Sequence, residues 1–315
     1  MAWATGIATD HRDLIGKLRD FLTSNTALVA LGQNWTRLSG PASGTPLVTD
    51  ELVFSGPGLT GGADIRVGLK FFENAGAGFF NVGFIGLTTS GVNDIENQPN
   101  ASRPHWMLLL NAPMTYWFVA NGRRFEIIVR AGSNYQQAYC GFILPEHFPD
   151  DWPYPLYVGA NSYERNIGNA NATVINSAYW QGATSSGGGD GAPSCASICD
   201  PGRLFRSQAN FWRTSSEADQ SNDSGQVLTY PWSIRWFDSR VRQSLTDQPT
   251  LVRGALFSEN TATGRVFYGA FDGLFYLPAF GVTAEQIITI GGVDHIAVPN
   301  TFRTGDSNFC AYALQ

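Results

Sequence analysis

Alternating apolar and polar residues predict a β-hairpin in the first third of the chain. Residues 63–72 read as an extended segment with one apolar side, made of Ile65, Val67, Leu69 and Phe71. Residues 74–78 are typical of a turn, and residues 80–86 alternate again on the return. A further strand is predicted over residues 47–54, so this region is expected to form antiparallel sheet.

A different spacing near the start predicts an amphipathic helix. Thr9 or Asp10 can cap its N-terminus, and residues 24–26 end it. Its apolar stripe follows the i, i+4, i+7, i+8 pattern and consists of Leu14, Leu18, Phe21 and Leu22. Because such a stripe must be covered, we expect the helix to dock on a sheet or on a partner. Leu14, Leu18 and Phe21 are therefore candidate interface residues.

The middle of the chain predicts an antiparallel meander. Its strands are expected over residues 106–110, 114–120, 123–131 and 135–144. Asn121-Gly122 is a strong signal for a two-residue hairpin turn, and Arg123 and Arg124 follow it, where they can reach carboxylates. Gly141 reads as a bulge or a close-packing position. Later strands are expected over residues 226–230, 252–257, 264–268, 274–276, 286–290, 293–298 and 309–314, with a turn at Gly291-Gly292.

Two segments lack a regular pattern. Residues 145–157 are rich in proline and aromatic residues, which favours an ordered strap lying over the sheet by its rings. Residues 161–225 are rich in Gly, Ser and Asn, which predicts a loop-rich insertion. The predicted fold is mainly β, an antiparallel sandwich or meander with an N-terminal amphipathic helix. We divide the chain into a helical segment (1–30), a β core with the strap (31–160), the insertion (161–225) and C-terminal strands that complete the same domain (226–315).

Composition narrows the range of partners. The formal net charge is −6, so a basic nucleic-acid-binding surface is not expected. Charged residues make up 15% and aromatic residues 13% of the chain, which excludes a disordered protein. Lys17 and Lys70 are the only lysines, whereas arginine is abundant. Arginine is favoured in packed interfaces, although codon bias toward arginine explains the same ratio.

The sequence contains no signature of a catalytic or cofactor site. No G-x-S-x-G motif occurs, and residues 187–191 lack the Lys-Ser/Thr of a phosphate-binding loop. Cys195 and Cys199 have no histidine nearby for zinc binding, and they form a disulfide only in an oxidising environment. The nearest acid–base cluster, Glu146-His147 with Asp150-Asp151, reads as a solvated turn. No spacing selects a pair of acids for glycoside cleavage. We therefore expect no enzyme, no cofactor and no metal.

Membrane and secretion signals are also missing from the sequence. No apolar stretch approaches the length of a membrane helix, so no membrane insertion is expected. The first residues lack the basic and long apolar regions of a secretion signal, which indicates synthesis in the cytoplasm.

The aromatic surplus has two interpretations. The rings can stack on sugars, or they can anchor an interface or a core. The second is favoured because so many of them fall at strand positions. The rings concerned are Trp152, Tyr154, Tyr157, Tyr179, Trp180, Phe211 and Trp212. Of these, Trp152, Tyr154 and Tyr157 join Arg123 and Arg124 as candidate interface residues.

Two segments resemble virion structural proteins of tailed bacteriophages. Residues 114–145 (MTYWFVANGRRFEIIVRAGSNYQQAYCGFILP) carry the W-F-x-A-N-G-R-R pattern of those proteins, and residues 153–160 (PYPLYVGA) resemble their proline strap. Residues 9–22 and 292–314 are also similar to them. Together these segments cover about a third of the chain. The insertion at 161–225 shows no such resemblance.

The resemblance implies a structural component of the virion, in the tail tip or baseplate, that is synthesised in the host cytoplasm. Its implied partners are other virion proteins and copies of itself. It carries over no catalytic residues. A receptor- or glycan-binding tail protein, with a host surface glycan as partner, is the alternative, and a polysaccharide depolymerase is the weakest interpretation.

Overall fold

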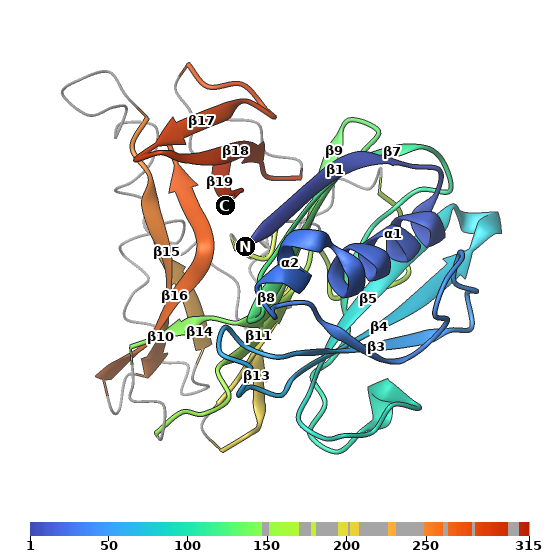
Figure 1. Cartoon of the computed structure of the whole chain (residues 1–315), viewed down its shortest axis with the longest axis horizontal. Coiled ribbons are helices and arrows are strands. Elements are labelled where there is room, and N and C mark those ends of the chain that lie inside the picture. The colour runs from blue at the N-terminus through green and yellow to red at the C-terminus, as the bar shows by residue number, and fades with distance from the viewer. Residues whose placement is uncertain are drawn as a thin grey trace, which may run out of the picture.

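Three antiparallel β-sheets form the layers of this computed structural model (Figure 1). We call them sheets A, B and C, and sheet A lies between the other two. The structure describes residues 1–146, 151–169, 178–180, 195–200, 202–207, 226–230, 249–260, 264–278, 281–301 and 309–314. Within them, no helix is long and apolar enough to cross a membrane.

Sheet A has seven strands in the order β1-β7-β8-β9-β11-β12-β13. Its strands are β1 (Ala2–Ala8), β7 (Met114–Ala120), β8 (Arg124–Ala131), β9 (Asn134–Phe142), β11 (Leu156–Gly159), β12 (Ala196–Cys199) and β13 (Phe205–Ser207). The first strand of the chain therefore pairs with β7, which lies more than a hundred positions later in the sequence.

Sheet B has the order β2-β3-β4-β5-β6 and packs on one face of sheet A together with the helices. Its strands are β2 (Thr36–Ser39), β3 (Glu51–Gly56), β4 (Ile65–Asn74), β5 (Phe79–Leu87) and β6 (His105–Met107). The helices are α1 (His11–Ser24) and α2 (Thr26–Ala30), with short 3₁₀ turns η1 (Ala75–Ala77) and η2 (Ile95–Asn97).

Sheet C covers the opposite face of sheet A, with the order β14-β15-β16-β19-β18-β17 and with β10 paired to β16. Its strands are β10 (Leu144–Pro145), β14 (Gln226–Tyr230), β15 (Val252–Asn260), β16 (Gly264–Leu277), β17 (Ile287–Ile290), β18 (Val293–Pro299) and β19 (Phe309–Ala313).

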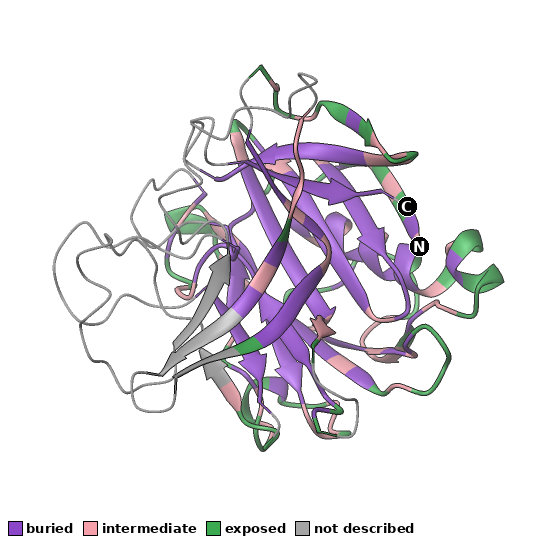
Figure 2. Cartoon of the chain, turned by 90° about the vertical axis from the view of Figure 1, so that its left-hand side faces the viewer, coloured by how far each residue is buried: buried purple, intermediate pink, exposed green. Residues whose placement is uncertain are grey.

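Burial on both faces explains the composition of sheet A. On β7, Phe118 faces sheet B and the helix, while its neighbours Trp117 and Val119 face sheet C. On β8, Ile127 and Ile128 divide in the same way. A sheet covered on one side would expose every second residue, but here both sets of side chains are buried (Figure 2).

Helix α1 forms as its sequence predicts. The Asp10 side chain caps it by accepting hydrogen bonds from the backbone N–H groups of Arg12 and Asp13. Its apolar stripe is buried in the core between sheets A and B, and the Phe21 ring lies 5.7 Å from that of Phe118 on β7. The helix thus docks on a sheet of its own chain.

The mainly-β antiparallel fold and the N-terminal helix are confirmed, and several local expectations need correction. Residues 2–8 form β1, which we did not predict. The end of the proline strap is β11, a strand inside sheet A rather than a layer over it. In the insertion, β12 and β13 extend sheet A, and much of the rest lies outside the described residues.

Glycines explain why one long strand was predicted as two. Gly269 and Gly273 interrupt the pattern between residues 264–268 and 274–276, yet β16 runs through both. Both have positive φ, and a side chain at Gly269 would collide with the Leu144 backbone of β10. These glycines therefore bend the strand and let neighbours approach closely.

Gly141 should be among the least replaceable positions of sheet A. Its φ is +143°, and an added Cβ would collide with the backbone of Arg123 and Arg124. We expect Gly141→Ala to lower the free energy of unfolding by about 3 kcal/mol. The control is Gly78→Ala, which also has positive φ but open space around it, and should cost about 1 kcal/mol. Urea denaturation measures both, and equal losses would contradict the predicted steric role.

Candidate functional site

The turn between β7 and β8 organises a buried cluster of charged residues. The Asn121 N–H donates to the carbonyl of Arg124 at 3.0 Å, so Gly122 and Arg123 are the central residues of the turn. The turn thus lies one residue later than Asn121-Gly122, the pair predicted from the sequence. The Asn121 side-chain oxygen accepts from the N–H groups of Arg123 and Arg124 at 2.8 and 3.1 Å.

Arg124 is fully buried at the centre of this cluster. Its Nη1 donates to Glu126 Oε2 at 2.9 Å, and its Nε lies 3.8 Å from Asp272 Oδ2. A side chain at Gly273 would collide with the Arg124 guanidinium, so the glycine makes room for it. Arginine suits this site because it stays charged even when buried.

Asp272 on β16 ties the turn to sheet C. Its Oδ2 accepts from Asn121 Nδ2 at 2.9 Å and from Arg123 Nη2 at 3.1 Å. Burial alone would raise the pKa of Asp272, but Arg124, Asn121 and Arg123 outweigh it and hold the pKa below its ordinary value. Asp272 is therefore the ionised acid of the cluster.

Glu126 is the second acid, and its surroundings differ. Its side chain is fully buried, and Oε1 has no hydrogen-bond partner among the described residues. Burial raises the pKa of Glu126 to about 8, and the nearby Arg124 only partly opposes this shift. The two carboxyl groups thus divide the roles, with Asp272 charged and Glu126 protonated at neutral pH.

A neutral polar network continues the contact between sheets A and C. The Gln137 side-chain oxygen on β9 accepts from Trp180 Nε1 at 2.7 Å and from the Tyr312 hydroxyl at 2.6 Å. Its amide group donates to the carbonyl of Pro299 at 2.8 Å. The four residues lie on separate segments, so Gln137 fixes their relative positions.

The predicted aromatic interface residues lie inside the chain. Trp152 donates from Nε1 to the Cys199 carbonyl at 2.9 Å, and the Tyr154 hydroxyl donates to the Leu87 carbonyl at 2.7 Å. The Tyr157 ring meets Phe271 of sheet C edge-on at 5.0 Å. These rings hold the layers together.

This placement corrects our expectation for most candidate interface residues. Arg123 keeps 28% of its side chain exposed, and the others lack surface to offer a neighbour. The buried ones are Leu14, Leu18, Phe21, Arg124, Trp152, Tyr154 and Tyr157. An aromatic-rich strand or an amphipathic helix can bury its apolar side either in its own chain or against a partner chain. The sequence pattern is the same in both cases.

In the part of the chain that the structure describes, no group of three or more His, Cys, Asp or Glu side chains is arranged to hold a metal. All four cysteines are buried and none forms a disulfide, so Cys195 and Cys199 are not joined. Residues 147–150, 187–191, 211 and 212 lie outside the described residues.

One contact of catalytic type escaped the sequence analysis. His105 Nε2 lies 2.8 Å from Ser197 Oγ, a pairing used to activate nucleophiles. His105 is 0% and Ser197 1% exposed, so a substrate cannot reach them. The contact joins β6 of sheet B to β12 of sheet A and has a structural role.

Comparisons with known proteins add no identification. No family model matches the sequence, and no curated protein matches it.

Glu126 should make stability depend on pH. Because its pKa is raised in the folded chain, the folded state keeps a proton that the unfolded chain releases above pH 4.5. The contribution of Glu126 to the free energy of unfolding is fully present below pH 4.5. It falls by about 1.4 kcal/mol per pH unit as the pH rises from there to about 8. Glu126→Gln mimics the protonated acid and should remove this loss.

The measurement is urea denaturation of both proteins between about pH 5 and pH 8. The difference between them is the informative quantity, because burial lowers the pKa of His11 and His295 and adds an opposite trend in both proteins. Parallel curves for the two proteins would contradict the prediction.

Proposed function

We propose that this protein is a structural component of a tailed-phage virion, in the tail tip or baseplate, and acts through contacts rather than catalysis. The resemblance of residues 114–145 and 153–160 to such proteins supports this role. These residues include β7, β8, β9 and β11, the central strands of sheet A. The shared pattern thus corresponds mainly to the scaffold of sheet A.

The observation that carries the assembly role is the free edge of sheet A at β1. β1 is a seven-residue edge strand, and no other described strand pairs with its outer side. Trp3 is 45% and Ile7 65% exposed on one face of this strand. Proteins normally protect a long edge with charges or prolines, and β1 has neither. Another chain can therefore pair with it and cover both side chains.

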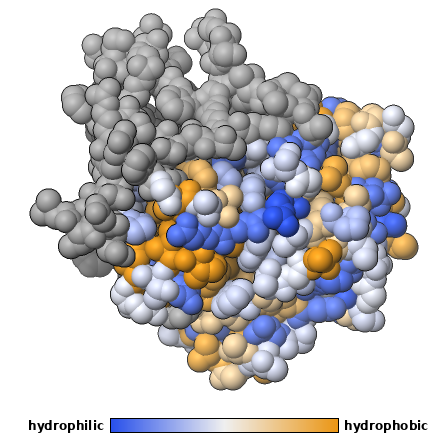
Figure 3. All heavy atoms as spheres, turned by 90° about the horizontal axis from the view of Figure 1, so that it is seen from above, coloured by the Kyte–Doolittle hydropathy of each residue, from blue (hydrophilic) through white to orange (hydrophobic). Residues whose placement is uncertain are grey.

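The surface composition is consistent with contacts to neighbours. Figure 3 shows hydrophobic residues gathered in patches among hydrophilic ones on the face seen from above. Further large apolar side chains, including Leu47 at 60% and Leu59 at 42%, are exposed elsewhere on the chain. A protein covered by neighbours in a particle tolerates such a surface.

The direct test is association with particles. Antibodies raised against the recombinant chain should detect it in gradient-purified phage particles, and gold-labelled antibodies should bind at the tail tip. A chain found only in the unassembled fraction of an infected lysate would disprove the virion role.

A double variant tests whether the β1 edge mediates assembly. We expect Trp3→Ser with Ile7→Ser to shift the chain toward monomers and to lower its incorporation into particles at least about tenfold, because the edge loses its apolar anchors. Light scattering after gel filtration and quantitative blotting of particles measure the two effects.

The matched control is Val29→Ser with Leu31→Ser, which removes two comparably exposed apolar residues from the region of α2. It should leave assembly unchanged. Equal loss in both double variants, or no loss in either, would contradict a specific role for β1.

Binding of a host surface glycan is a second candidate function. A surface pocket beside Tyr154 favours it.

A further inference from the structure

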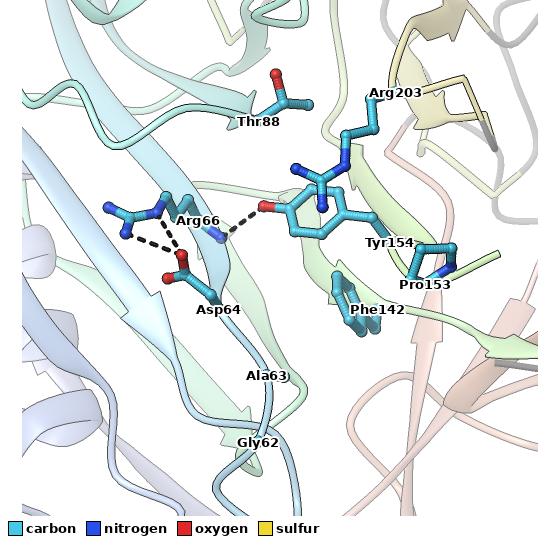
Figure 4. A pocket seen from close by; sticks show the side chains of 9 residues that line it. All are labelled: Gly62, Ala63, Asp64, Arg66, Thr88, Phe142, Pro153, Tyr154 and Arg203. Carbon is cyan, nitrogen blue, oxygen red and sulfur yellow. Dashed lines mark hydrogen bonds and ion pairs between the residues drawn. The ribbon is translucent and has the colours of Figure 1, made fainter. Parts of the chain in front are cut away.

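A pocket opens on the surface between the start of β4 and the turn that precedes β13. Its volume is about 300 Å³, at the lower end of the range for small-molecule sites. Figure 4 shows Arg66 and Asp64 on one side of the Tyr154 ring and Arg203 reaching in from the other. Phe142 and Thr88 also line the pocket.

Tyr154 forms a rigid floor. Its hydroxyl accepts from the Arg66 N–H at 3.1 Å and donates to the Leu87 carbonyl at 2.7 Å, so both hydrogen-bonding roles are filled. The Phe142 ring packs edge-on against it, with 5.1 Å between centroids. The floor is therefore formed before any ligand arrives, which lowers the entropic cost of binding.

Arg203 supplies a positive charge to the pocket. Its guanidinium lies over the Tyr154 ring at 5.4 Å, and no described carboxylate forms an ion pair with it. A tight turn presents it, in which the Arg203 N–H donates to the Asp200 carbonyl at 2.9 Å. Arg203 has a φ of +60°, a backbone conformation that costs about 1 kcal/mol for a residue other than glycine.

The opposite wall supplies hydrogen-bond acceptors. Arg66 Nη2 pairs with Asp64 Oδ2 at 2.9 Å, which largely neutralises both groups. Asp64 Oδ2 accepts from both Arg66 Nε and Nη2, whereas Oδ1 accepts only from Ser55 Oγ at 3.1 Å. The Asp64 side chain is 65% exposed, so Oδ1 keeps a free position for a hydroxyl donor. The Thr88 hydroxyl donates to the carbonyl of Asn100 at 3.4 Å, and its oxygen can accept a further hydrogen bond.

We propose that this pocket binds an acidic sugar, a pyranose ring that carries a carboxylate, such as a hexuronate residue of a surface polysaccharide. The carboxylate pairs with Arg203, the ring hydroxyls donate to Asp64, and the apolar face of the ring packs on Phe142. A neutral sugar leaves Arg203 unpaired. A phosphate ion brings no hydroxyl-bearing ring for Asp64 and no apolar ring face for Phe142.

This inference goes beyond the proposed structural role and does not depend on it. A chain that fails to enter particles can still bind the sugar, and a virion subunit can lack sugar binding. The experiments on particles and those on the pocket therefore fail separately.

The test uses the full chain and three soluble probes. Saturation-transfer NMR and calorimetry should show binding of glucuronate in the millimolar range, at least about tenfold weaker binding of glucose, and weaker binding of inorganic phosphate than of glucuronate. Equal affinity for glucose and glucuronate, or no glucuronate binding at about 10 mM, would overturn the proposal. Tighter binding of phosphate than of glucuronate would overturn the sugar assignment.

Variants of Arg203 identify the pocket as the site. Arg203→Gln should weaken glucuronate binding at least about tenfold. The matched control is Arg165→Gln, which removes another exposed guanidinium that lies over an aromatic ring, 5.0 Å from the Phe72 centroid, and should bind glucuronate like the wild type. Unchanged binding in Arg203→Gln, or equal losses in the two variants, would overturn the assignment.

Two more variants make two distinctions. One separates a loss of binding from a loss of folding, and the other separates recognition of a sugar from recognition of any small anion. Arg203→Gly suits the positive φ, so it should lose binding while keeping full stability. Asp64→Asn should weaken glucuronate binding about threefold or more without weakening phosphate binding, because only the sugar uses the carboxylate as an acceptor. Stronger glucuronate binding in Asp64→Asn would show that the site recognises charge alone and would overturn the sugar assignment.

Discussion

The covering of sheet A on both faces is the constraint on which the rest of the molecule depends. A side chain on its inner strands has no route to water, so it must be apolar or have a buried partner. This requirement accounts for many of the aromatic residues of the chain, since rings such as Trp117, Tyr139 and Tyr157 fill the space between sheets A and C. The same requirement removes them from any surface contact.

The two faces of sheet A are held in different ways. The face toward sheet B is mainly apolar, with α1 as part of the packing, and it includes the His105–Ser197 and Gln136–Asn169 hydrogen bonds. The face toward sheet C also contains Arg124, Glu126 and the Gln137 network. Apolar packing tolerates sliding, whereas hydrogen bonds and ion pairs require one register. We infer that the polar groups fix where sheet C docks, and that the apolar contacts supply most of the stability.

Local sequence patterns predicted the local structure well. They did not predict features that depend on contacts between distant segments. The bounds of β7 were predicted correctly from the alternation of apolar residues, and the buried stripe of α1 from their helical spacing. Both patterns depend only on residues close together in the sequence. β1 was missed because Trp3 and Ile7 face outward while Ala4 and Gly6 give little apolar signal. The pocket could not be predicted because Asp64, Tyr154 and Arg203 come from distant segments, and nothing in the 161–225 pattern distinguishes Arg203.

The topology of sheet A connects the two proposed surfaces. β1 forms one edge of the sheet, and β13, which follows Arg203 closely, forms the other. A subunit held in a particle through β1 would therefore keep the Arg203 pocket at the far edge, away from that contact. Because the strands between them are hydrogen-bonded and buried, the sheet connects the two edges as a rigid unit. Assembly at one edge and recognition at the other are thus compatible, and neither requires a part of the core to move.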